Sequence, residues 1–210
     1  MPNQLPNNAL YLVTESNLAR GRPNSYMVSK AIEGGATIVQ LREKEWTKEQ
    51  YAEEARIIAG ICKEHSVFFV VNDYPDIARD VGADGLHLGQ EDMPLSQARR
   101  IYSGVIGKST HSREQALAAV VEGADYISIG PVFPTRKKPN PVGLQLVREM
   151  APKLPIPFVA IGGIKLHNAE KVLEAGATRI AVISALVEAD DVERAAQDFI
   201  MIIRRDAEWK

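Results

Sequence analysis

The sequence predicts a single (β/α)₈ barrel, and three observations support this prediction. Short, nearly continuous apolar runs alternate with longer segments that have helical spacing of apolar residues, as in a parallel sheet covered by helices. A Gly-Ala turn sequence recurs between a helical segment and the next apolar run. Polar and charged residues follow the ends of most apolar runs. A doubly wound open sheet is the competing fold, but it would scatter those residues along an edge, whereas a barrel gathers them on one face.

The 210 residues suffice for one domain with a substantial core and no disulfides. The apolar runs predict eight strands: Leu10–Val13, Thr37–Leu41, Val67–Val71, Gly85–Leu88, Val105–Gly107, Tyr126–Ile129, Pro157–Ile161 and Arg179–Ile183. Helical spacing is clearest in five segments: Lys48–Lys63, Ser112–Glu122, Gly143–Ala151, Leu166–Glu174 and Asp191–Ile203. We therefore expect a polar N-terminal extension over residues 1–9 and the barrel over residues 10–210.

The Gly-Ala turns form a weak internal repeat that begins at four glycines: Gly35, Gly82, Gly123 and Gly176. Glycine can adopt the left-handed conformation that ends a helix, and the small alanine fits a tight turn into a buried strand. The spacing of 41 to 53 residues excludes a regular solenoid and fits barrel units of unequal length.

Charge and composition exclude several classes of partner. Twenty-five basic and 27 acidic residues give a net charge of −2, which argues against a surface for nucleic acid or an anionic membrane. No apolar stretch approaches the ~20 residues of a membrane span. Residues 1–9 lack the apolar core of a signal peptide, and the single Cys62 cannot form an intrachain disulfide. We therefore expect a soluble cytoplasmic protein, with homo-oligomer formation left open.

Two clusters of cationic residues after apolar runs predict a phosphate or pyrophosphate site, because cationic side chains neutralise phosphate oxygens. The first cluster contains Gln40, Leu41, Arg42, Glu43 and Lys44. The second contains Thr135, Arg136, Lys137 and Lys138. The alternative interpretation is a set of rim charges balanced by Glu43 and the acidic residues that follow it.

Two aspartates predict a metal site. Asp73 follows Asn72 at the end of one run, and Asp92 follows the next run. Carboxylates from neighbouring strand ends are suitable Mg²⁺ ligands when substrate oxygens and water complete the octahedron. The alternative is that each aspartate caps a helix, before Pro75 and Pro94 respectively. Capping explains each residue alone but not the pair.

The last two strands predict a further phosphate position. Gly163 and Ser184, preceded by Ile183, follow these strands, and in barrels this is the usual place for a phosphate. A tight strand–helix turn is the structural alternative. Among the histidines, His111 is close enough to Ser109 to reach the pocket, whereas His87 is expected in the core.

Together these segments resemble the thiamin phosphate synthase (thiamin-phosphate pyrophosphorylase) family and, more distantly, the related thiazole tautomerases. The family fold is a (β/α)₈ barrel. The resemblance runs from Leu10 to Ala185, and these segments carry it: Val39–Lys44, Val71–Asp73, Gly82–Asp92, Gly130–Thr135, Ala160–Ile164 and Val182–Ala185.

The resemblance implies a transferase that couples 4-amino-5-hydroxymethyl-2-methylpyrimidine diphosphate to a thiazole phosphate by a dissociative substitution, with release of pyrophosphate. It implies these ligands for the pyrimidine diphosphate: Gln40, Arg42, Lys44, Asn72, Ser109 and Lys138. It assigns Mg²⁺ to Asp73 and Asp92, and the thiazole phosphate to Thr135, Gly163, Ile183 and Ser184. The expected catalytic residues are Arg42, Lys44, Ser109 and Lys138, and the neighbouring Leu41, Glu43, Arg136 and Lys137 complete the expected substrate contacts.

Two details bear on the alternatives. Lys137 stands where the family has a hydroxyl residue, and the connection to Gly143 is short. Pro131 stands where the tautomerase has a catalytic histidine, which favours the synthase over a tautomerase-like isomerase. A non-catalytic barrel that binds phosphate ligands is the third interpretation, and binding without turnover would identify it.

Overall fold

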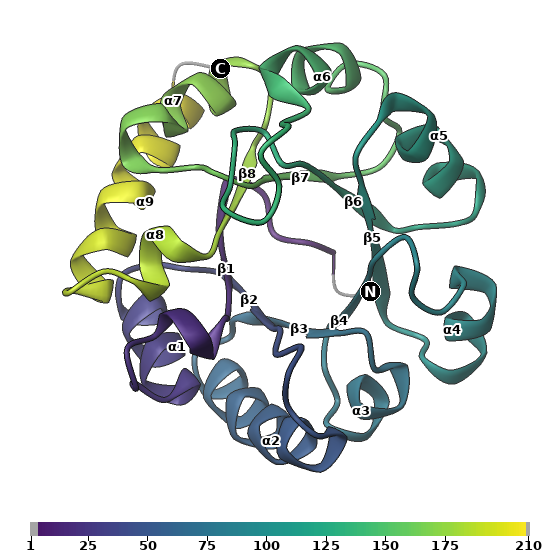
Figure 1. Cartoon of the computed structure of the whole chain (residues 1–210), viewed down its shortest axis with the longest axis vertical. Helices are drawn as coiled ribbons and strands as arrows, with labels where there is room; N and C mark the ends of the chain where they lie inside the picture. Colours follow the sequence, from purple (N-terminus) through teal and green to yellow (C-terminus); the bar gives the residue numbers. More distant parts are fainter. Residues whose placement is uncertain (1–3, 209–210) are drawn as a thin grey trace.

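The computed structural model describes residues 4–208, and at its centre eight parallel strands form a closed barrel (Figure 1). The strands are β1 (Ala9–Val13), β2 (Ile38–Leu41), β3 (Phe68–Asn72), β4 (Gly85–Leu88), β5 (Val105–Thr110), β6 (Tyr126–Ile129), β7 (Phe158–Ile161) and β8 (Arg179–Val182). They follow one another around the barrel in chain order, and β1 closes it by pairing with both β2 and β8. The predicted fold class is therefore confirmed.

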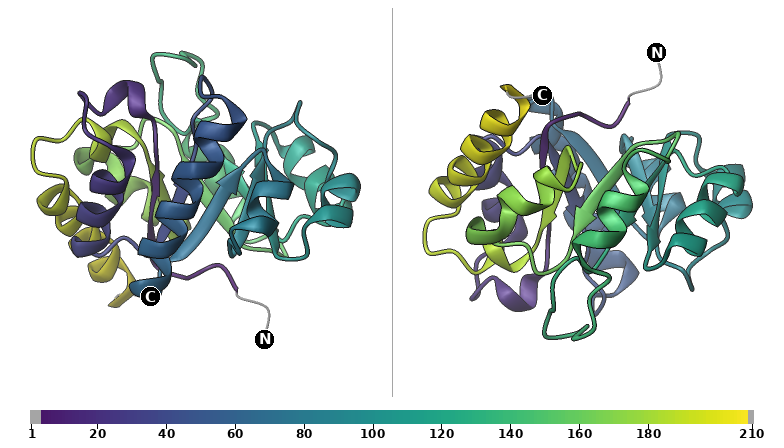
Figure 2. Two further views of the ribbon diagram at one scale, coloured as in Figure 1. Left: turned by 90° about the horizontal axis from the view of Figure 1, so that it is seen from below. Right: turned by 90° about the horizontal axis from the view of Figure 1, so that it is seen from above.

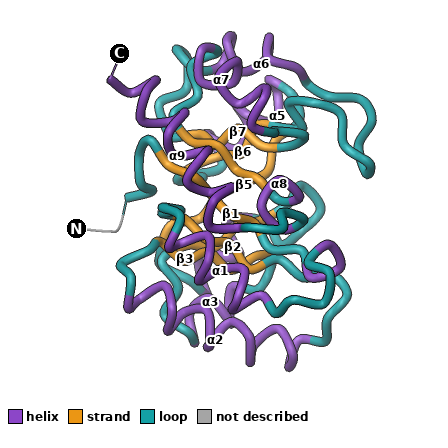
Figure 3. The backbone as a smooth tube through the Cα atoms, turned by 90° about the vertical axis from the view of Figure 1, so that its left-hand side faces the viewer, coloured by secondary structure: helices purple, strands orange, loops and turns teal. Residues whose placement is uncertain are grey.

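Helices form a layer around the barrel (Figures 1 and 3). They are α1 (Asn24–Glu33), α2 (Lys48–Glu64), α3 (Pro75–Asp80), α4 (Leu95–Ile101), α5 (Arg113–Val121), α6 (Gly143–Met150), α7 (Leu166–Glu174), α8 (Ser184–Val187) and α9 (Val192–Glu208), with a 3₁₀ turn, η1 (Ser16–Leu18). All five predicted helical segments are helices. Helices α1, α3, α4 and α8 were not predicted, and the last three are too short, at four to seven residues, for an apolar periodicity to show.

Two apolar layers hold the fold together. Along β3, Phe68 and Val70 face the barrel interior, whereas Phe69 and Val71 pack against the helices. Because both faces of each strand are buried, the strands appear in the sequence as continuous apolar runs. The alternation decides which polar residues at the strand ends face the barrel axis.

The N-terminal segment closes one end of the barrel. Leu5 is buried among the interior side chains, and Arg179 donates from Nε to the Pro6 carbonyl oxygen at 2.6 Å. Figure 2 shows this segment at one end and the loop over residues 134–142 at the other. Strand β1 begins at Ala9, so part of the expected extension has a structural role, while residues 1–3 and 209–210 lie outside the described part of the chain.

The turn prediction is also confirmed: Gly35, Gly82, Gly123 and Gly176 all have positive φ angles. Within residues 4–208, none of the helices combines the length and the apolar character that crossing a membrane requires.

Candidate active site

The carboxyl ends of the strands bring most of the predicted residues to one end of the barrel. Gln40, Asn72, His87 and Ser109 come from β2, β3, β4 and β5, and the strand pairing aligns Asn72 with His87. Gln40, Asn72 and His87 are buried, and Ser109 is half-buried. The strand alternation turns all four side chains toward the barrel axis, where they form the floor of the site.

A chain of hydrogen bonds crosses this floor. Gln40 Nε2 donates to Tyr11 Oη at 2.6 Å, and Tyr11 Oη lies 3.2 Å from Tyr126 Oη. Tyr126 Oη lies 2.9 Å from His87 Nδ1, and His87 Nε2 lies 2.9 Å from Ser109 Oγ. The chain therefore connects Gln40 on β2 with Ser109 on β5 through three buried aromatic rings.

Only one direction of donation gives every polar hydrogen atom between Gln40 and His87 an acceptor within this chain. Burial raises the pKa values of Tyr11 and Tyr126, so both phenols keep their protons. Because Gln40 already donates to Tyr11, Tyr11 donates to Tyr126 and Tyr126 donates to His87 Nδ1. Burial lowers the pKa of His87 to about 4, so its ring is neutral and its Nε2 hydrogen points at Ser109. The Ser109 hydroxyl hydrogen is then free to donate toward the mouth.

Two cations at the mouth share one carboxylate. Arg42 Nη1 lies 3.0 Å from Glu15 Oε2, and Lys137 Nζ lies 3.0 Å from Glu15 Oε1. Sequence analysis missed Glu15, which lies two residues after the end of β1. The rim-charge interpretation named Glu43 as the balancing group, and that detail is wrong. The Glu43 carboxylate faces away from the mouth and accepts hydrogen bonds from Ser16 and Asn24.

Asp73 and Asp92 form the predicted carboxylate pair. Asp73 is in ion-pair contact with Lys44, yet its Oδ1 atom is buried and has no hydrogen-bond partner. Burial, followed by the neighbouring Asp92 carboxyl, raises the pKa of Asp73 to about 6. Asp92 accepts a hydrogen bond from the Gly89 N–H group at 2.6 Å. An unsatisfied carboxylate oxygen beside a second carboxylate fits a divalent cation.

The helix-capping alternative for these aspartates is wrong. The N-cap residues of α3 and α4 are Tyr74 and Pro94, and neither helix has a side-chain cap. Asp73 itself has a φ angle of 67°, a left-handed conformation that Asp tolerates better than most residues. Within residues 4–208, no group of three or more His, Cys, Asp or Glu side chains could hold a metal. A cation at this pair would therefore need oxygens from a bound ligand.

The loop over residues 134–142 carries the second cationic cluster. The Thr135 hydroxyl accepts from the Lys138 N–H group at 2.9 Å and so closes a turn. Lys138 Nζ lies 2.9 Å from His111 Nε2. Arg136 is exposed and lies 3.4 Å from Glu188. The Lys137 side chain is 74% exposed, although its ammonium group contacts Glu15.

The loops after β7 and β8 meet beside this cluster. Gly163 has a φ angle of 67°, and a Cβ atom there would lie 2.7 Å from the Phe133 carbonyl oxygen, so only glycine fits. Lys165 Nζ donates to Ser184 Oγ at 2.8 Å. Ile183 directly precedes α8 and is half-buried. Lys165 was missed by sequence analysis, although it lies two residues after Gly163 and adds a cation to the expected phosphate position.

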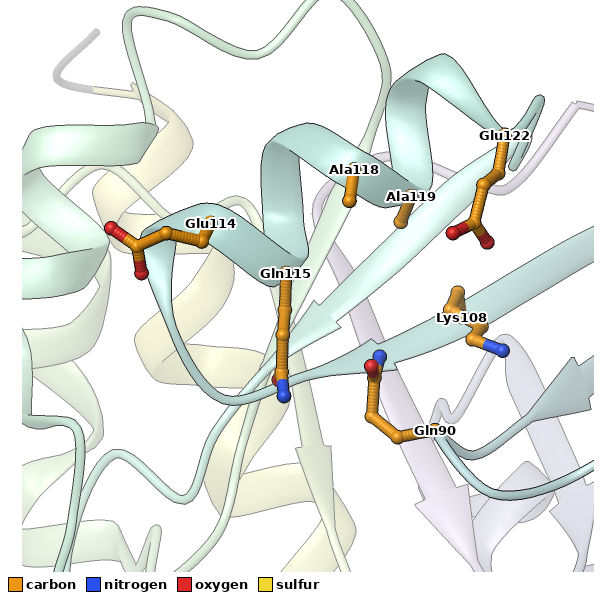
Figure 4. Close-up of a pocket in the computed structure, with 7 residues that line it drawn as sticks. All are labelled: Gln90, Lys108, Glu114, Gln115, Ala118, Ala119 and Glu122. Carbon is orange, nitrogen blue, oxygen red and sulfur yellow. The ribbon is translucent and has the colours of Figure 1, made fainter.

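Two residues at or just after strand ends point elsewhere. The Leu41 side chain is fully buried in the layer between barrel and helices, which excludes it from the mouth. Gln90 lines a cavity of about 230 Å³ outside the barrel beside α5, together with the outward-facing Lys108 (Figure 4). Gln90 still contacts the site through its Nε2 atom, which donates to the Ser109 carbonyl oxygen.

Comparison with known proteins assigns the chain to one family. A family described as thiamine monophosphate synthase matches residues 10–186. A thiamine-phosphate synthase of Halalkalibacterium halodurans is 44% identical over 201 residues, which are 93% of this chain and 95% of the relative. One of Chloroflexus aurantiacus is 45% identical over 198 residues, which are 92% of each chain.

A solved structure titled thiamine phosphate pyrophosphorylase, from Pyrococcus furiosus, superposes with a TM-score of 0.89 and 39% sequence identity. The superposition covers 95% of this chain and 98% of that one. The family model, the relatives and the solved structure agree, and the chain belongs to the thiamine monophosphate synthase family.

Proposed function

We propose that this protein is a transferase that joins 4-amino-5-hydroxymethyl-2-methylpyrimidine diphosphate to a thiazole phosphate, producing thiamin phosphate and pyrophosphate. Two relatives named thiamine-phosphate synthase align with more than nine tenths of this chain. The observation in the site that carries the proposal is the Asp73–Asp92 pair beside Lys44, with an unsatisfied carboxylate oxygen. Such a pair suits a diphosphate that arrives with a divalent cation.

The reaction breaks the bond between the pyrimidine methylene carbon and the diphosphate oxygen, and the electron pair leaves with the diphosphate. The lone pair of the thiazole nitrogen then forms the new bond to that carbon. This chemistry needs neutralisation of the departing charge more than a strong base. Arg42, Lys44 and Lys138 supply positive charge, and the free Ser109 hydroxyl hydrogen supplies a neutral donor.

The floor of the site would orient the pyrimidine. Gln40 and Asn72 present amide groups there, and the hydrogen-bond chain fixes the orientation of the Gln40 amide. The neutral His87 ring keeps an extra positive charge out of the floor. We infer that the floor binds the neutral pyrimidine ring of the substrate, while the loops bind its charged diphosphate.

Mg²⁺ is the cation that we propose for Asp73 and Asp92, where it would supply positive charge to the diphosphate oxygens. Lys44 forms an ion pair with the Asp73 carboxylate in this structure. With the cation and diphosphate bound, Lys44 would be released to contact the diphosphate instead.

The thiazole phosphate is assigned to the loops after β7 and β8. Gly163 lets the loop after β7 pack closely against Phe133 and Pro134, and Lys165 and Ser184 add a cation and a hydroxyl. Thr135 contributes by closing the turn that presents Lys138. Arg136 and Lys137 would add only exposed charge near the entrance.

The other interpretations have less support. A tautomerase-like isomerase would need a histidine at the position of Pro131, and a non-catalytic binding barrel would not need the carboxylate pair. The names of the relatives give no support to either. A cytoplasmic location, a homo-oligomer and the absence of nucleic-acid or membrane partners stay predictions.

The test is to incubate the purified protein with both substrates and MgCl₂ and to measure thiamin phosphate and pyrophosphate together. We expect equal amounts of the two products and none without the thiazole phosphate. Arg42→Met, which removes the charge and keeps an unbranched side chain, should lower the rate on the order of 10²-fold. Binding of both substrates without product would contradict the proposal and favour the non-catalytic interpretation.

A further inference from the structure

His111 connects the loop over residues 134–142 with the barrel wall. Its Nδ1 atom is within hydrogen-bond distance of the Gly130 carbonyl oxygen, just after the end of β6. Its Nε2 atom lies 2.9 Å from Lys138 Nζ. The His111 backbone is fixed as well, since its N–H group donates to Gln115 Oε1 at 2.7 Å. The imidazole therefore joins a rigid strand end to the ammonium group of a loop lysine.

The two contacts define the protonation state of this ring. A carbonyl oxygen only accepts, so Nδ1 carries a hydrogen and donates to Gly130. An ammonium group only donates, so Nε2 has a free lone pair and accepts from Lys138. Both contacts exist together only in the neutral tautomer with its hydrogen on Nδ1. A doubly protonated ring would lose the acceptor and would repel Lys138.

The rest of the loop holds Lys138 by its backbone alone. Thr135 fixes the Lys138 N–H and carbonyl groups, which leaves the four-carbon side chain free to rotate. Among residues 4–208, no other side chain forms a hydrogen bond or ion pair with the Lys138 ammonium group. A free lysine side chain loses rotamer entropy when it becomes ordered. A prior contact to His111 removes part of that cost before the substrate arrives.

We propose that His111 is a positioning residue that holds Lys138 over the barrel mouth, where the lysine meets the departing diphosphate. The inference rests on the proposed function, because it concerns the same diphosphate. It goes beyond that function by giving a role to a residue outside the expected set of substrate ligands. His111 acts through Lys138 and does not itself contact a substrate.

Two conservative variants separate the two contacts of the ring. In His111→Asn, the amide nitrogen replaces Nδ1 and keeps the bond to Gly130, but no acceptor reaches Lys138. In His111→Gln, the amide oxygen replaces Nε2 and keeps the acceptor for Lys138, while the bond to Gly130 is lost. His65→Asn, at an exposed position at the end of α2, is the matched control. Lys138→Met supplies the background for a double-mutant cycle.

We expect His111→Asn to lower kcat about 10-fold with the KM for the thiazole phosphate unchanged, because a misplaced group costs transition-state stabilisation. His111→Gln should stay within about threefold of the wild-type kcat, and His65→Asn should match the wild type. In the Lys138→Met background, His111→Asn should change kcat less than about twofold, because the lysine through which it acts is gone.

Each failure has its own pattern. A wild-type enzyme without product contradicts the proposed function itself, and a fully active Lys138→Met contradicts the role of that lysine. If Lys138→Met is slow while His111→Asn matches the wild type, only the positioning role is overturned. Equal loss in His111→Asn and His111→Gln would also overturn it, since it would indicate a structural role. If His111→Asn melts at a much lower temperature than the wild type, its rate is set aside and His111→Gln alone tests the inference. A kcat of His111→Gln near that of Lys138→Met then overturns it.

Discussion

The Nε2 atom of His87 lies 2.9 Å from the Oγ atom of Ser109 at the inner wall of the barrel. The contact has one consistent direction, with the neutral imidazole donating and the hydroxyl accepting. Burial maintains that neutral state, because it lowers the pKa of His87 to about 4. The stability of the fold and the orientation of Ser109 therefore depend on the same ring.

This arrangement predicts a loss of stability in mild acid. The folded-state pKa of His87 is below its unfolded value of about 6.5, so the unfolded chain binds the proton more tightly. Stability is then fully present above pH 6.5 and declines as the pH falls toward 4. Between pH 7 and pH 5 the wild type should lose about 2 kcal/mol more of its free energy of unfolding than His87→Gln. Urea unfolding at the two pH values measures this difference, and equal losses would refute the prediction.

Gly107→Ala should destabilise the barrel. A Cβ atom at this position would lie 2.1 Å from Tyr126 Cζ, and the hydrogen bonds of Tyr126 to Tyr11 and His87 prevent its ring from moving aside. We expect a loss of more than about 2 kcal/mol in the free energy of unfolding. Gly60→Ala is the matched control, because α2 leaves open space at that position. It should stabilise the protein by about 0.5–1 kcal/mol, and similar effects of the two variants would contradict the packing argument.

Asp73→Asn should impair metal-dependent turnover while it leaves the fold intact. Asn has nearly the shape of Asp and tolerates the left-handed backbone at this position, but it loses the negative charge that a cation requires. We expect kcat to fall on the order of 10²-fold, with a free energy of unfolding within about 1 kcal/mol of the wild type. Rates measured across a MgCl₂ titration, together with urea unfolding, test both parts.

The matched control for that variant is Asp80→Asn, at an exposed position at the end of α3. It should show the wild-type response to MgCl₂. Normal magnesium dependence and normal rate in Asp73→Asn would remove this residue from the proposed metal site. Full wild-type activity after exhaustive chelation would show that the reaction does not require a metal.

Lys137→Thr should leave the KM for the thiazole phosphate within about threefold of the wild type. The lysine is paired with Glu15, but its side chain is 74% exposed, and exposed ion pairs contribute little in water. Steady-state kinetics with the thiazole phosphate varied measures the effect. A large rise in this KM alone would instead identify Lys137 as a phosphate ligand in place of the family's hydroxyl residue.

Several features could be predicted from the sequence because they depend on local patterns. Continuous apolar runs indicated strands buried on both faces, and the turn glycines indicated where helices end. The order of the strand ends was enough to bring Gln40, Asn72 and Ser109 to one face, because in a barrel of parallel strands every carboxyl end lies at the same rim. Asp73 and Asp92 were predicted as a pair for the same reason.

Contacts between distant segments were decided only by the tertiary structure. The role of Glu15, the burial of Glu43 and the link from His111 to Lys138 depend on side-chain direction and on how loops far apart in the chain meet. The hydrogen-bond chain from Gln40 to Ser109 needs successive polar atoms, on rings from three separate strands, to lie about 3 Å apart. Sequence spacing carries no information at that scale, because the direction of each side chain is set by packing against residues elsewhere in the chain.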